Sequence, residues 1–397
     1  MSEPVVSEPV VSEPVVSGAG HAGEVVVDLA AVRGNVAALR EHAAGAQVMA
    51  VVKADAYGHG LVPAARAALA GGATWLGVAQ VGEALALRAA GVGGRVLCWL
   101  YTPDADLAPL VAADVDVSVS APWALDRVVA AAAAVGSVAR VHLKVDTGLG
   151  RNGCPPAQWP DLVDATLRAE RDGAVRLVGV WSHLAFADAP HHPTVRRQAE
   201  VFEDAVAVAT GRGADLEVRH LANSAAVLTS PQVHYDLVRP GLAVYGLSPV
   251  PDLGGPADYG LVPAMTVRTT LALVKDVPAG HGVSYGHEYT TPQATRLGLV
   301  PLGYADGVPR HASNRGPLLV GGARTRVAGR VCMDQVVVDL GPDSPAVAGD
   351  PVVLLGPGSA GEPTAQDWAD AAGTISYEIV TRMSARLPRR WVGQEVT

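Results

Sequence analysis

The 397-residue sequence predicts an α/β protein in which an N-terminal (β/α)8, TIM-like barrel precedes a C-terminal, mostly β domain. Eight short apolar runs rich in β-branched residues alternate with Ala-rich amphipathic stretches between residues 24 and 248, as parallel βαβ units do. After Pro249 the pattern changes to alternating Val, Thr and Leu with tight turns. A Pro/Gly-rich stretch at residues 252–256 separates the two patterns and is typical of a linker.

The barrel is predicted strand by strand. Its expected strands are residues 47–53, 75–80, 95–100, 115–120, 140–146, 177–183, 216–222 and 236–239. Helices are expected between them at residues 29–43, 81–90, 122–134, 160–170 and 194–210. A doubly wound sheet could use the same alternation, but eight units favour a closed barrel, which we place at residues 24–252.

The C-terminal β domain is expected over residues 253–397. Its strands are predicted within residues 265–275, 295–303, 325–340 and 351–356, and one late helix is predicted at Ala365–Ala372.

The first 23 residues follow neither pattern, because Ser-Glu-Pro-Val-Val occurs three times in tandem there. Proline at every fifth residue forbids a regular helix. We expect a disordered acidic tail over residues 1–23, with a partner-binding repeat as the alternative. The segment has neither a basic start nor a continuous apolar stretch, so it does not match a secretory signal.

Composition limits the possible partners. The net charge of −9 argues against a general nucleic-acid binder. The most apolar run, residues 128–139, is too short to cross a bilayer, which takes ~20 helical residues. The three cysteines form no C-x-x-C pair, and an odd number is a poor disulfide framework. We therefore expect a cytoplasmic protein with no nucleic-acid or membrane partner.

A lysine closes the first predicted barrel strand, where the chain reads Lys-Ala-Asp-Ala-Tyr-Gly-His-Gly from Lys53 to Gly60. Burial disfavours the charge of a lysine, and the unprotonated amine is a nucleophile for carbonyl groups. The alternative is an ordinary strand-end lysine that reaches solvent.

Another strand end carries Lys-Val-Asp-Thr-Gly-Leu-Gly-Arg, from Lys144 to Arg151. A guanidinium beyond a glycine turn is a natural anchor for a planar anion. The alternative is a loop with a solvated arginine.

The seventh predicted strand leads into Asn223 and Ser224, at the start of a predicted helix. Free backbone amides and a hydroxyl at a helix start can bind a phosphate, and in barrels the loops after strands seven and eight often do so. Gly241, just past the eighth strand, would let a phosphate approach its amide. Ser224 could also be a simple helix cap. A nucleophilic lysine and a phosphate site on one barrel face fit a phosphate-bearing aldehyde such as pyridoxal 5′-phosphate (PLP).

In the β domain, Tyr285 lies between a serine and a glycine, a turn-like setting that could present its phenol. A tyrosine needs cationic neighbours to act as a base near neutral pH. The alternative is a packed aromatic side chain with its hydroxyl satisfied. Further motifs of this domain are Gly-Tyr-Ala-Asp-Gly at residues 303–307, Gly-Arg-Val-Cys-Met-Asp at 329–334 and Thr-Ile-Ser-Tyr-Glu at 374–378.

Taken together, these motifs resemble the alanine racemase family, PLP-dependent enzymes built from a barrel and a β domain. The resemblance runs from Glu24 to about Pro388, with the motifs in the family's order. It implies a homodimer that interconverts L- and D-alanine by two-base proton transfer and supplies D-alanine for peptidoglycan. It also implies that Lys53 holds PLP and is one base, while Tyr285 of the partner subunit is the opposite base.

The remaining site residues are likewise implied by the resemblance. Phosphate contacts match Tyr57, Ser224 with its neighbour Asn223, Gly241, Leu242 and Tyr377. Arg239 matches the arginine facing the pyridine nitrogen, and His183 the residue beside the ring. Arg151 and the amide of Met333 match the binders of the substrate carboxylate. Lys144 matches a lysine that is carbamylated in some members. The substrate access path matches Asp188, Tyr304, Arg310 and Arg330.

Four alternatives remain open at this point. A racemase of broader specificity would differ only in small pocket changes. A PLP-dependent decarboxylase of the same architecture generally places a carboxylate at the pyridine nitrogen, against which Arg239 argues. A non-catalytic PLP carrier resembles the barrel alone. A metal-dependent barrel hydrolase would use Lys144 as a carbamylated ligand, but its histidine pairs are missing, and we assign no metal ligand.

Overall fold

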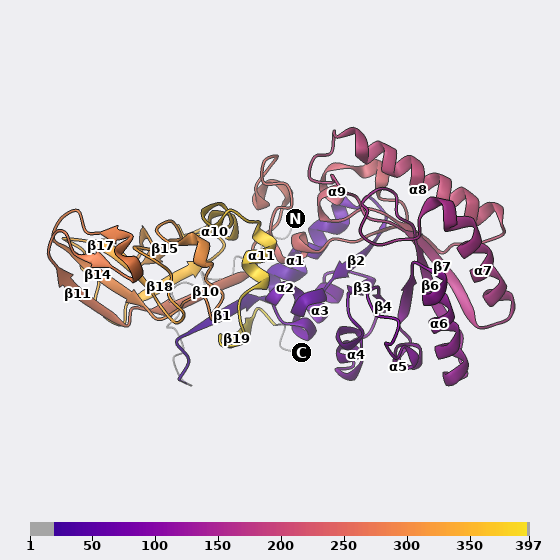
Figure 1. The fold of residues 1–397 in the computed structure, drawn as a ribbon, viewed down its shortest axis with the longest axis horizontal. Coiled ribbons are helices and arrows are strands. Elements are labelled where there is room, and N and C mark those ends of the chain that lie inside the picture. The colour runs from indigo at the N-terminus through magenta and orange to yellow at the C-terminus, as the bar shows by residue number, and fades with distance from the viewer. Residues whose placement is uncertain (1–19, 395–397) are drawn as a thin grey trace, which may run out of the picture. The chain divides into compact units, whose positions relative to one another are not determined.

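A computed structural model describes residues 20–394 (Figure 1), so the Ser-Glu-Pro-Val-Val repeats and their predicted disorder lie outside the described residues. The described chain divides into two compact units. The barrel unit comprises residues 32–56 and 60–261. The β unit comprises the residues up to Ala31, residues 57–59 and the residues from Val262 onward.

The barrel unit is built on eight parallel strands, which confirms the predicted fold class. They follow the order β8-β7-β6-β5-β4-β3-β2-β9. A bridge between Asn223 and Arg239 joins the segments after β8 and β9, so the ring is nearly closed. Each strand overlaps a predicted one: β2 (Gln47–Val51), β3 (Trp75–Val78), β4 (Arg95–Cys98), β5 (Asp116–Val119), β6 (Ala139–Lys144), β7 (Val175–Trp181), β8 (Val218–His220) and β9 (Leu237–Val238).

Helices surround these strands, and α4 to α8 lie on the outside of the barrel (Figure 1). The helices are α1 (Leu29–His42), α3 (Leu61–Ala70), α4 (Val81–Ala89), α5 (Ala108–Ala112), α6 (Pro122–Val135), α7 (Trp159–Arg171), α8 (Pro193–Gly211) and α9 (Ser224–Thr229). The five predicted helices correspond to α1, α4, α6, α7 and α8. Between residues 20 and 394, no helix combines the length and apolar character needed to cross a membrane.

The barrel interior is filled with side chains rather than open. One core cluster takes a side chain from each of six strands: Met49, Trp75, Leu97, Val178, Val218 and Leu237. Burying a side chain of this size contributes about 1.5–3 kcal/mol to folding. The packed interior leaves the carboxyl ends of the strands as the place for chemistry.

A left-handed turn follows β2 and was not predicted. In α2 (Lys53–Gly58), residues 54–57 have φ angles of 53° to 54° although none is glycine. This conformation costs about 1–2 kcal/mol per residue. Two bonds oppose that cost: Glu83 Oε1 accepts from the Ala54 amide at 2.6 Å, and Asp55 Oδ1 accepts from the Leu61 amide at 2.8 Å. Strain of this kind persists where the surroundings enforce it, and it is enriched at functional sites.

The β unit holds three sheets and two helices. A six-stranded sheet has the order β16-β15-β18-β10-β1-β19, a three-stranded sheet β11-β14-β17, and β12 pairs with β13. The strands are β1 (Gly23–Asp28), β10 (Met265–Thr270), β11 (Leu273–Val277), β12 (Gly282–Val283), β13 (Tyr289–Thr290), β14 (Thr295–Val300), β15 (Pro317–Val320), β16 (Ala323–Arg326), β17 (Val336–Gly341), β18 (Pro351–Leu355) and β19 (Arg389–Val392). The helices are α10 (Ala365–Ala372), as predicted, and α11 (Ser376–Thr381).

The first strand lies in a different unit from the one the sequence indicated. The predicted barrel began at residue 24, whereas β1 pairs antiparallel with β10 and parallel with β19 in the β unit. Its Val25, Val26 and Val27 are almost fully buried there. A short run of valines is compatible with a buried strand in the barrel or in the β unit. The local pattern therefore does not predict in which of the two sheets the strand lies.

Candidate active site

Lys53 begins the left-handed turn directly after β2, at the carboxyl-terminal edge of the barrel strands, where the sequence placed it. Burial, followed by the positive charge of Arg151, lowers the pKa of the Lys53 amine, and Glu83 partly offsets both. The amine is therefore more easily deprotonated than that of a lysine in water, as a nucleophile or proton acceptor requires.

A second buried lysine lies at the end of β6. Burial, with the charges of Arg239 and Arg151, lowers the pKa of Lys144 to about 7. Its Nζ lies 4.3 Å from the centre of the Trp181 ring, which offers a cation–π contact. Near neutral pH a large fraction of Lys144 is thus uncharged.

Four basic side chains surround His183 in the barrel unit. Burial lowers the pKa of His183 well below its usual value, and the charges of Arg239, Arg151, Lys144 and Lys53 lower it further. The acids that raise pKa values in this cluster are Asp146, acting on Lys144, and Glu83, acting on Lys53. Positive charge exceeds negative charge, so the cluster is suited to an anionic ligand.

Arg239 follows β9 and is buried. Its guanidinium donates to the carbonyls of Ser182 at 2.7 Å and Leu221 at 3.3 Å, and to His220 Nδ1 at 3.2 Å. All three acceptors are neutral, and burial lowers the pKa of Arg239 to about 9. Arg239 therefore remains a charged donor at neutral pH without a carboxylate of its own.

Ser224 organises the backbone at the predicted phosphate position. Its Oγ accepts from the amides of Gly241 at 2.8 Å and Ala243 at 3.3 Å, so the starts of α9 and of the Leu242–Tyr245 turn lie together. Asn223 caps α9 through its Oδ1, which accepts from the Ala226 amide at 3.2 Å. Grouped backbone amides and hydroxyls of this kind bind phosphate esters, so the site fits a group that carries one.

Arg151 and Asp188 lie on loops of the barrel unit. The Arg151 loop is shaped by Asp146, whose Oδ1 accepts from the amides of Gly148 at 3.0 Å and Gly150 at 3.1 Å. The influence of Arg151 on the pKa values of Lys53 and Lys144 places it in the cation cluster. Asp188 is exposed and forms no part of that cluster.

In the β unit, Tyr57 and Tyr377 are neighbours. Their ring centres are 6.2 Å apart, and Tyr57 is buried. Burial raises the pKa of Tyr57, so its hydroxyl stays protonated and can donate a hydrogen bond. The two predicted phosphate contacts thus lie side by side although 320 positions separate them in the sequence.

Tyr285 is presented on an exposed turn of the β unit. Its relative exposure is 69 %, and the preceding Ser284 has a φ of +62°. Ser284 Oγ donates to the Arg330 carbonyl at 2.8 Å, which joins this turn to the segment leading to Met333. Met333 and Tyr304 are also exposed, and the Tyr304 amide donates to the Cys332 carbonyl at 3.0 Å. The segments that carry Tyr285, Tyr304 and Met333 are therefore joined by hydrogen bonds.

A small pocket of the β unit contains both predicted access-path arginines. Its volume is about 230 Å³, and Arg310 and Arg330 line it together with Glu288, His311, Ser313 and Arg315. Arg330 pairs with Glu288 at 2.5 Å, which fixes its guanidinium.

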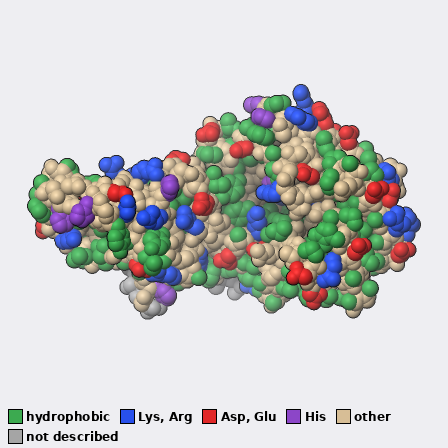
Figure 2. All heavy atoms as spheres, viewed as in Figure 1, with side chains coloured by type: hydrophobic (Ala, Val, Ile, Leu, Met, Phe, Trp, Pro, Cys, Tyr) green, Lys and Arg blue, Asp and Glu red, His purple; other side chains and the backbone are tan. Residues whose placement is uncertain are grey.

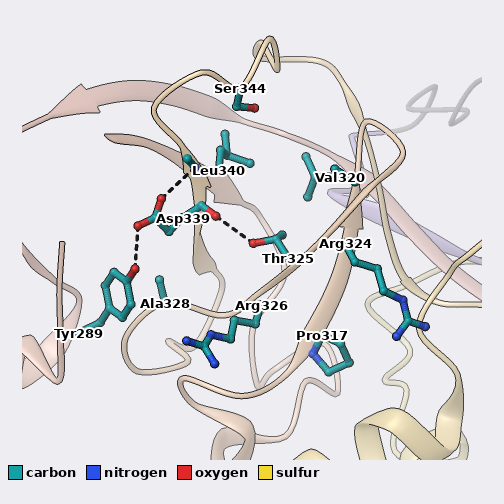
Figure 3. Close-up of a pocket in the computed structure, with 12 residues that line it drawn as sticks. Tyr289, Pro317, Val320, Arg324, Thr325, Arg326, Ala328, Asp339, Leu340 and Ser344 are labelled. Atoms are coloured by element: carbon teal, nitrogen blue, oxygen red, sulfur yellow. Dashed lines mark hydrogen bonds between the residues drawn. The ribbon is translucent and has the colours of Figure 1, made fainter. Parts of the chain in front are cut away.

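A larger pocket of the β unit, of about 600 Å³, contains none of the predicted site residues (Figure 3). The side chain of Asp339 accepts from the Tyr289 hydroxyl at 2.7 Å and from Thr295 Oγ1 at 2.5 Å. The central carboxylate of this pocket is therefore satisfied from within the protein.

The sequence analysis missed a set of buried polar groups beneath Arg239. His220, His142 and Asp116 are fully buried, and none of them is among the predicted site residues. A signal is present in the sequence, because His142 and Asp116 each interrupt a pair of apolar neighbours within a predicted barrel strand. Buried polar side chains require partners, so such interruptions indicate an internal network.

A barrel whose strand ends carry buried lysines, an arginine and a phosphate-type amide cluster, followed by a β domain, defines a class of PLP-binding enzymes. The family described as "Alanine racemase, N-terminal domain" matches residues 27–249, and "Alanine racemase, C-terminal domain" matches residues 264–391. This chain belongs to the alanine racemase family. It is therefore a PLP-dependent isomerase, and the decarboxylase, carrier and hydrolase alternatives are set aside.

Related sequences and solved structures are similar to this chain over nearly its whole length. Alanine racemase of Streptomyces coelicolor is 61 % identical over 373 residues, covering 93 % of this chain and 95 % of the relative. Alanine racemase of Beutenbergia cavernae is also 61 % identical, covering 93 % and 97 %. The crystal structure of alanine racemase from D-cycloserine producing Streptomyces lavendulae has a TM-score of 0.93 at 59 % identity, covering 94 % and 98 %.

Proposed function

We propose that this chain interconverts L-alanine and D-alanine, with Lys53 and Tyr285 as bases on opposite faces of the substrate Cα. The observation that carries the proposal is the buried Lys53 amine with its lowered pKa, in a cluster with surplus positive charge. Racemisation removes a proton from one face of a carbon and returns one to the other, so two opposed bases are a direct solution. The simplest test is the appearance of D-alanine from L-alanine, by chiral chromatography, until the two are equal.

PLP, when bound, supplies an electron sink that acidifies the Cα–H of the amino acid. The residues proposed to hold it are Lys53, Tyr57, His183, Asn223, Ser224, Arg239, Gly241, Leu242 and Tyr377. Ser224 and the nearby amides of Gly241 and Ala243 supply donors suited to the phosphate. Arg239, a charged donor at neutral pH, would face the pyridine nitrogen and keep it an acceptor.

The substrate carboxylate is proposed to bind Arg151 and the backbone amide of Met333. Arg151 already contributes to the positive cluster, and a guanidinium can bind a carboxylate through two parallel bonds. Fixing the carboxylate holds Cα between the bases, which lowers the entropy cost of each proton transfer. Arg310 and Arg330, which share one pocket, are proposed with Tyr304 and Asp188 to line the substrate access path.

The active protein is proposed to be a cytoplasmic homodimer in which each subunit lends its Tyr285 to the other. Tyr285 and Met333 are 69 % and 53 % exposed, so both side chains are available to a partner subunit. Cys98, Cys154 and Cys332 are free thiols, as a reducing compartment favours.

Mixing two inactive variants tests the shared site. Chains with Lys53→Ala and chains with Tyr285→Ala, unfolded and refolded together, should regain about a quarter of the wild-type activity, because half of the dimers are mixed and each has one intact site. Racemase assays before and after mixing give the comparison, with each variant refolded alone as the control. Mixed dimers verified by mass spectrometry but devoid of activity would show that both bases come from one chain.

Lys144 is proposed to carry a carbamate formed with carbon dioxide. Only the unprotonated amine reacts, and the pKa of about 7 makes that form abundant at neutral pH. The resulting anion would lie among Arg151, Arg239 and Lys53 and offset their charge.

Under ¹³C-labelled carbon dioxide at fixed pressure, we expect a Lys144 carbamate resonance that grows as the pH rises through about 7, beside any resonance of the α-amino group, whose ordinary pKa is about 8. The chain has only three lysines, so Lys144→Met should remove this resonance and Lys275→Met should keep it. If Lys144→Met lost none of the carbamate resonances, the modification would be assigned elsewhere.

A further inference from the structure

A line of buried polar groups runs through the barrel interior from Arg239 to Asp116. Arg239 Nη1 lies 3.2 Å from His220 Nδ1, and His220 Nε2 lies 2.9 Å from His142 Nδ1. His142 Nε2 lies 3.1 Å from Asp116 Oδ2. Asp116 begins β5, His142 lies within β6, and His220 ends β8, so three strands contribute one link each.

Arg239 and Asp116, at the two ends of this line, determine which ring nitrogen carries the proton in each histidine between them. A guanidinium only donates, so His220 Nδ1 must accept, and the ring proton of neutral His220 is on Nε2. That Nε2–H donates to His142 Nδ1, so the His142 proton is on Nε2 and points to Asp116. Burial, with the charge of Arg239, lowers the pKa of His220 well below its usual value, which agrees with a neutral ring. All three bonds therefore run in one direction, from a cation to a carboxylate.

The neighbouring residues hold both rings in place. Trp181 stacks on His220 with ring centres 5.6 Å apart and planes 5° apart, and Trp75 meets His142 edge-on at 5.4 Å. At Gly179 a Cβ atom would lie 2.4 Å from the Val218 carbonyl and 3.1 Å from His142 Nδ1. A glycine is therefore required where β7 passes the His142 ring.

The far end of the line is fixed by two cations. Asp116 Oδ2 pairs with Arg95 at 2.6 Å, and Asp116 Oδ1 pairs with Arg140 at 2.7 Å. Burial would raise the pKa of Asp116, but the bond from His142 and the charges of Arg95 and Arg140 outweigh it and hold the pKa at about 2. Asp116 thus remains an anion throughout the pH range in which an enzyme works.

We propose that Asp116 and His142 are positioning residues for Arg239, because through His220 they fix the acceptor that orients its guanidinium. The inference rests on the proposed function, in which Arg239 faces the pyridine nitrogen. The other two acceptors of Arg239 are backbone carbonyls, so His220 is its side-chain acceptor, and the Trp181 ring, whose centre lies 4.8 Å from the guanidinium carbon, is its other side-chain contact. If His220 lost its acceptor at Nε2, that buried N–H would be left without a partner, and the ring would no longer be held with Nδ1 facing Arg239.

Two measurements on the holoenzyme test this. Neutron diffraction from deuterated crystals should place deuterium on Nε2 of both rings and none on either Nδ1. In His142→Phe, the bond between Arg239 and His220 Nδ1 should lengthen or be lost, the absorption spectrum of bound PLP should shift, and kcat should fall about 10- to 100-fold. The KM for alanine should stay within about twofold, since Arg151 is untouched.

Asp116→Asn is the second variant, in case His142→Phe folds poorly, and it should cause the same kind of change in kcat and spectrum. His42→Phe is the matched control, because His42 also contacts an aromatic ring but bonds only the Tyr259 carbonyl. Deuterium on His220 Nδ1 in the wild type would overturn the proposal, as would a kcat of folded His142→Phe equal to that of the control. A wild-type enzyme that fails to racemise alanine would instead refute the proposed function.

Discussion

Replacing Lys53 with alanine is expected to abolish racemisation, by about 10⁴-fold or more, because one residue supplies both the anchor for PLP and one base. Borohydride treatment of the wild-type holoenzyme should fix PLP to Lys53, which peptide mass spectrometry would locate. With only three lysines in the chain, the assignment is unambiguous.

Lys275→Ala is the control for that experiment. Lys275 lies on the exposed strand β11 of the β unit, and its replacement should leave both activity and labelling unchanged. Labelling of Lys144, the other buried lysine, would overturn the assignment of Lys53.

Replacing Tyr285 with phenylalanine is expected to lower racemisation by about 10²- to 10⁴-fold while leaving the spectrum of bound PLP largely intact. Only the hydroxyl is lost, from a side chain that is mostly exposed in the single chain. Because the other base remains, the variant should still exchange the Cα hydrogen of one enantiomer with solvent, which proton NMR in heavy water would detect.

Tyr289→Phe provides the matched control, because it removes the hydroxyl of a tyrosine in the same unit that bonds Asp339. It should leave the exchange of both enantiomers unchanged. If Tyr285→Phe lost bound PLP instead, Tyr285 would be a structural residue rather than a base.

Much of the fold could be predicted because the signals are local. Apolar runs of β-branched residues and helical periodicity locate all eight barrel strands and the major helices. The partner of β1 could not be predicted, because pairing with β10 joins residues more than 200 positions apart. The left-handed turn at residues 54–57 could not be predicted either, since tertiary contacts rather than glycines enforce it.

Part of the candidate site could likewise be predicted from local sequence, and part of it depends on the fold. Lys53, Lys144 and Arg239 each lie at the carboxyl end of a predicted barrel strand. Because the carboxyl ends of parallel strands meet at one face of a barrel, the sequence predicts that the three residues share that face. The pKa values that make the two lysines reactive depend on burial and on Arg151 and Arg239, which only the fold brings near. The bond between His142 and His220 depends on the register of the barrel, so the sequence could only mark these residues as polar interruptions.

The most direct test of two opposed bases follows L-alanine through one turnover in heavy water. We expect the first D-alanine formed to carry deuterium at Cα, while the L-alanine that remains is still largely protonated, because one group removes the proton and another delivers deuterium. Early D-alanine that retains the original proton would mean that a single group carries it from one face to the other, and that result would contradict the account.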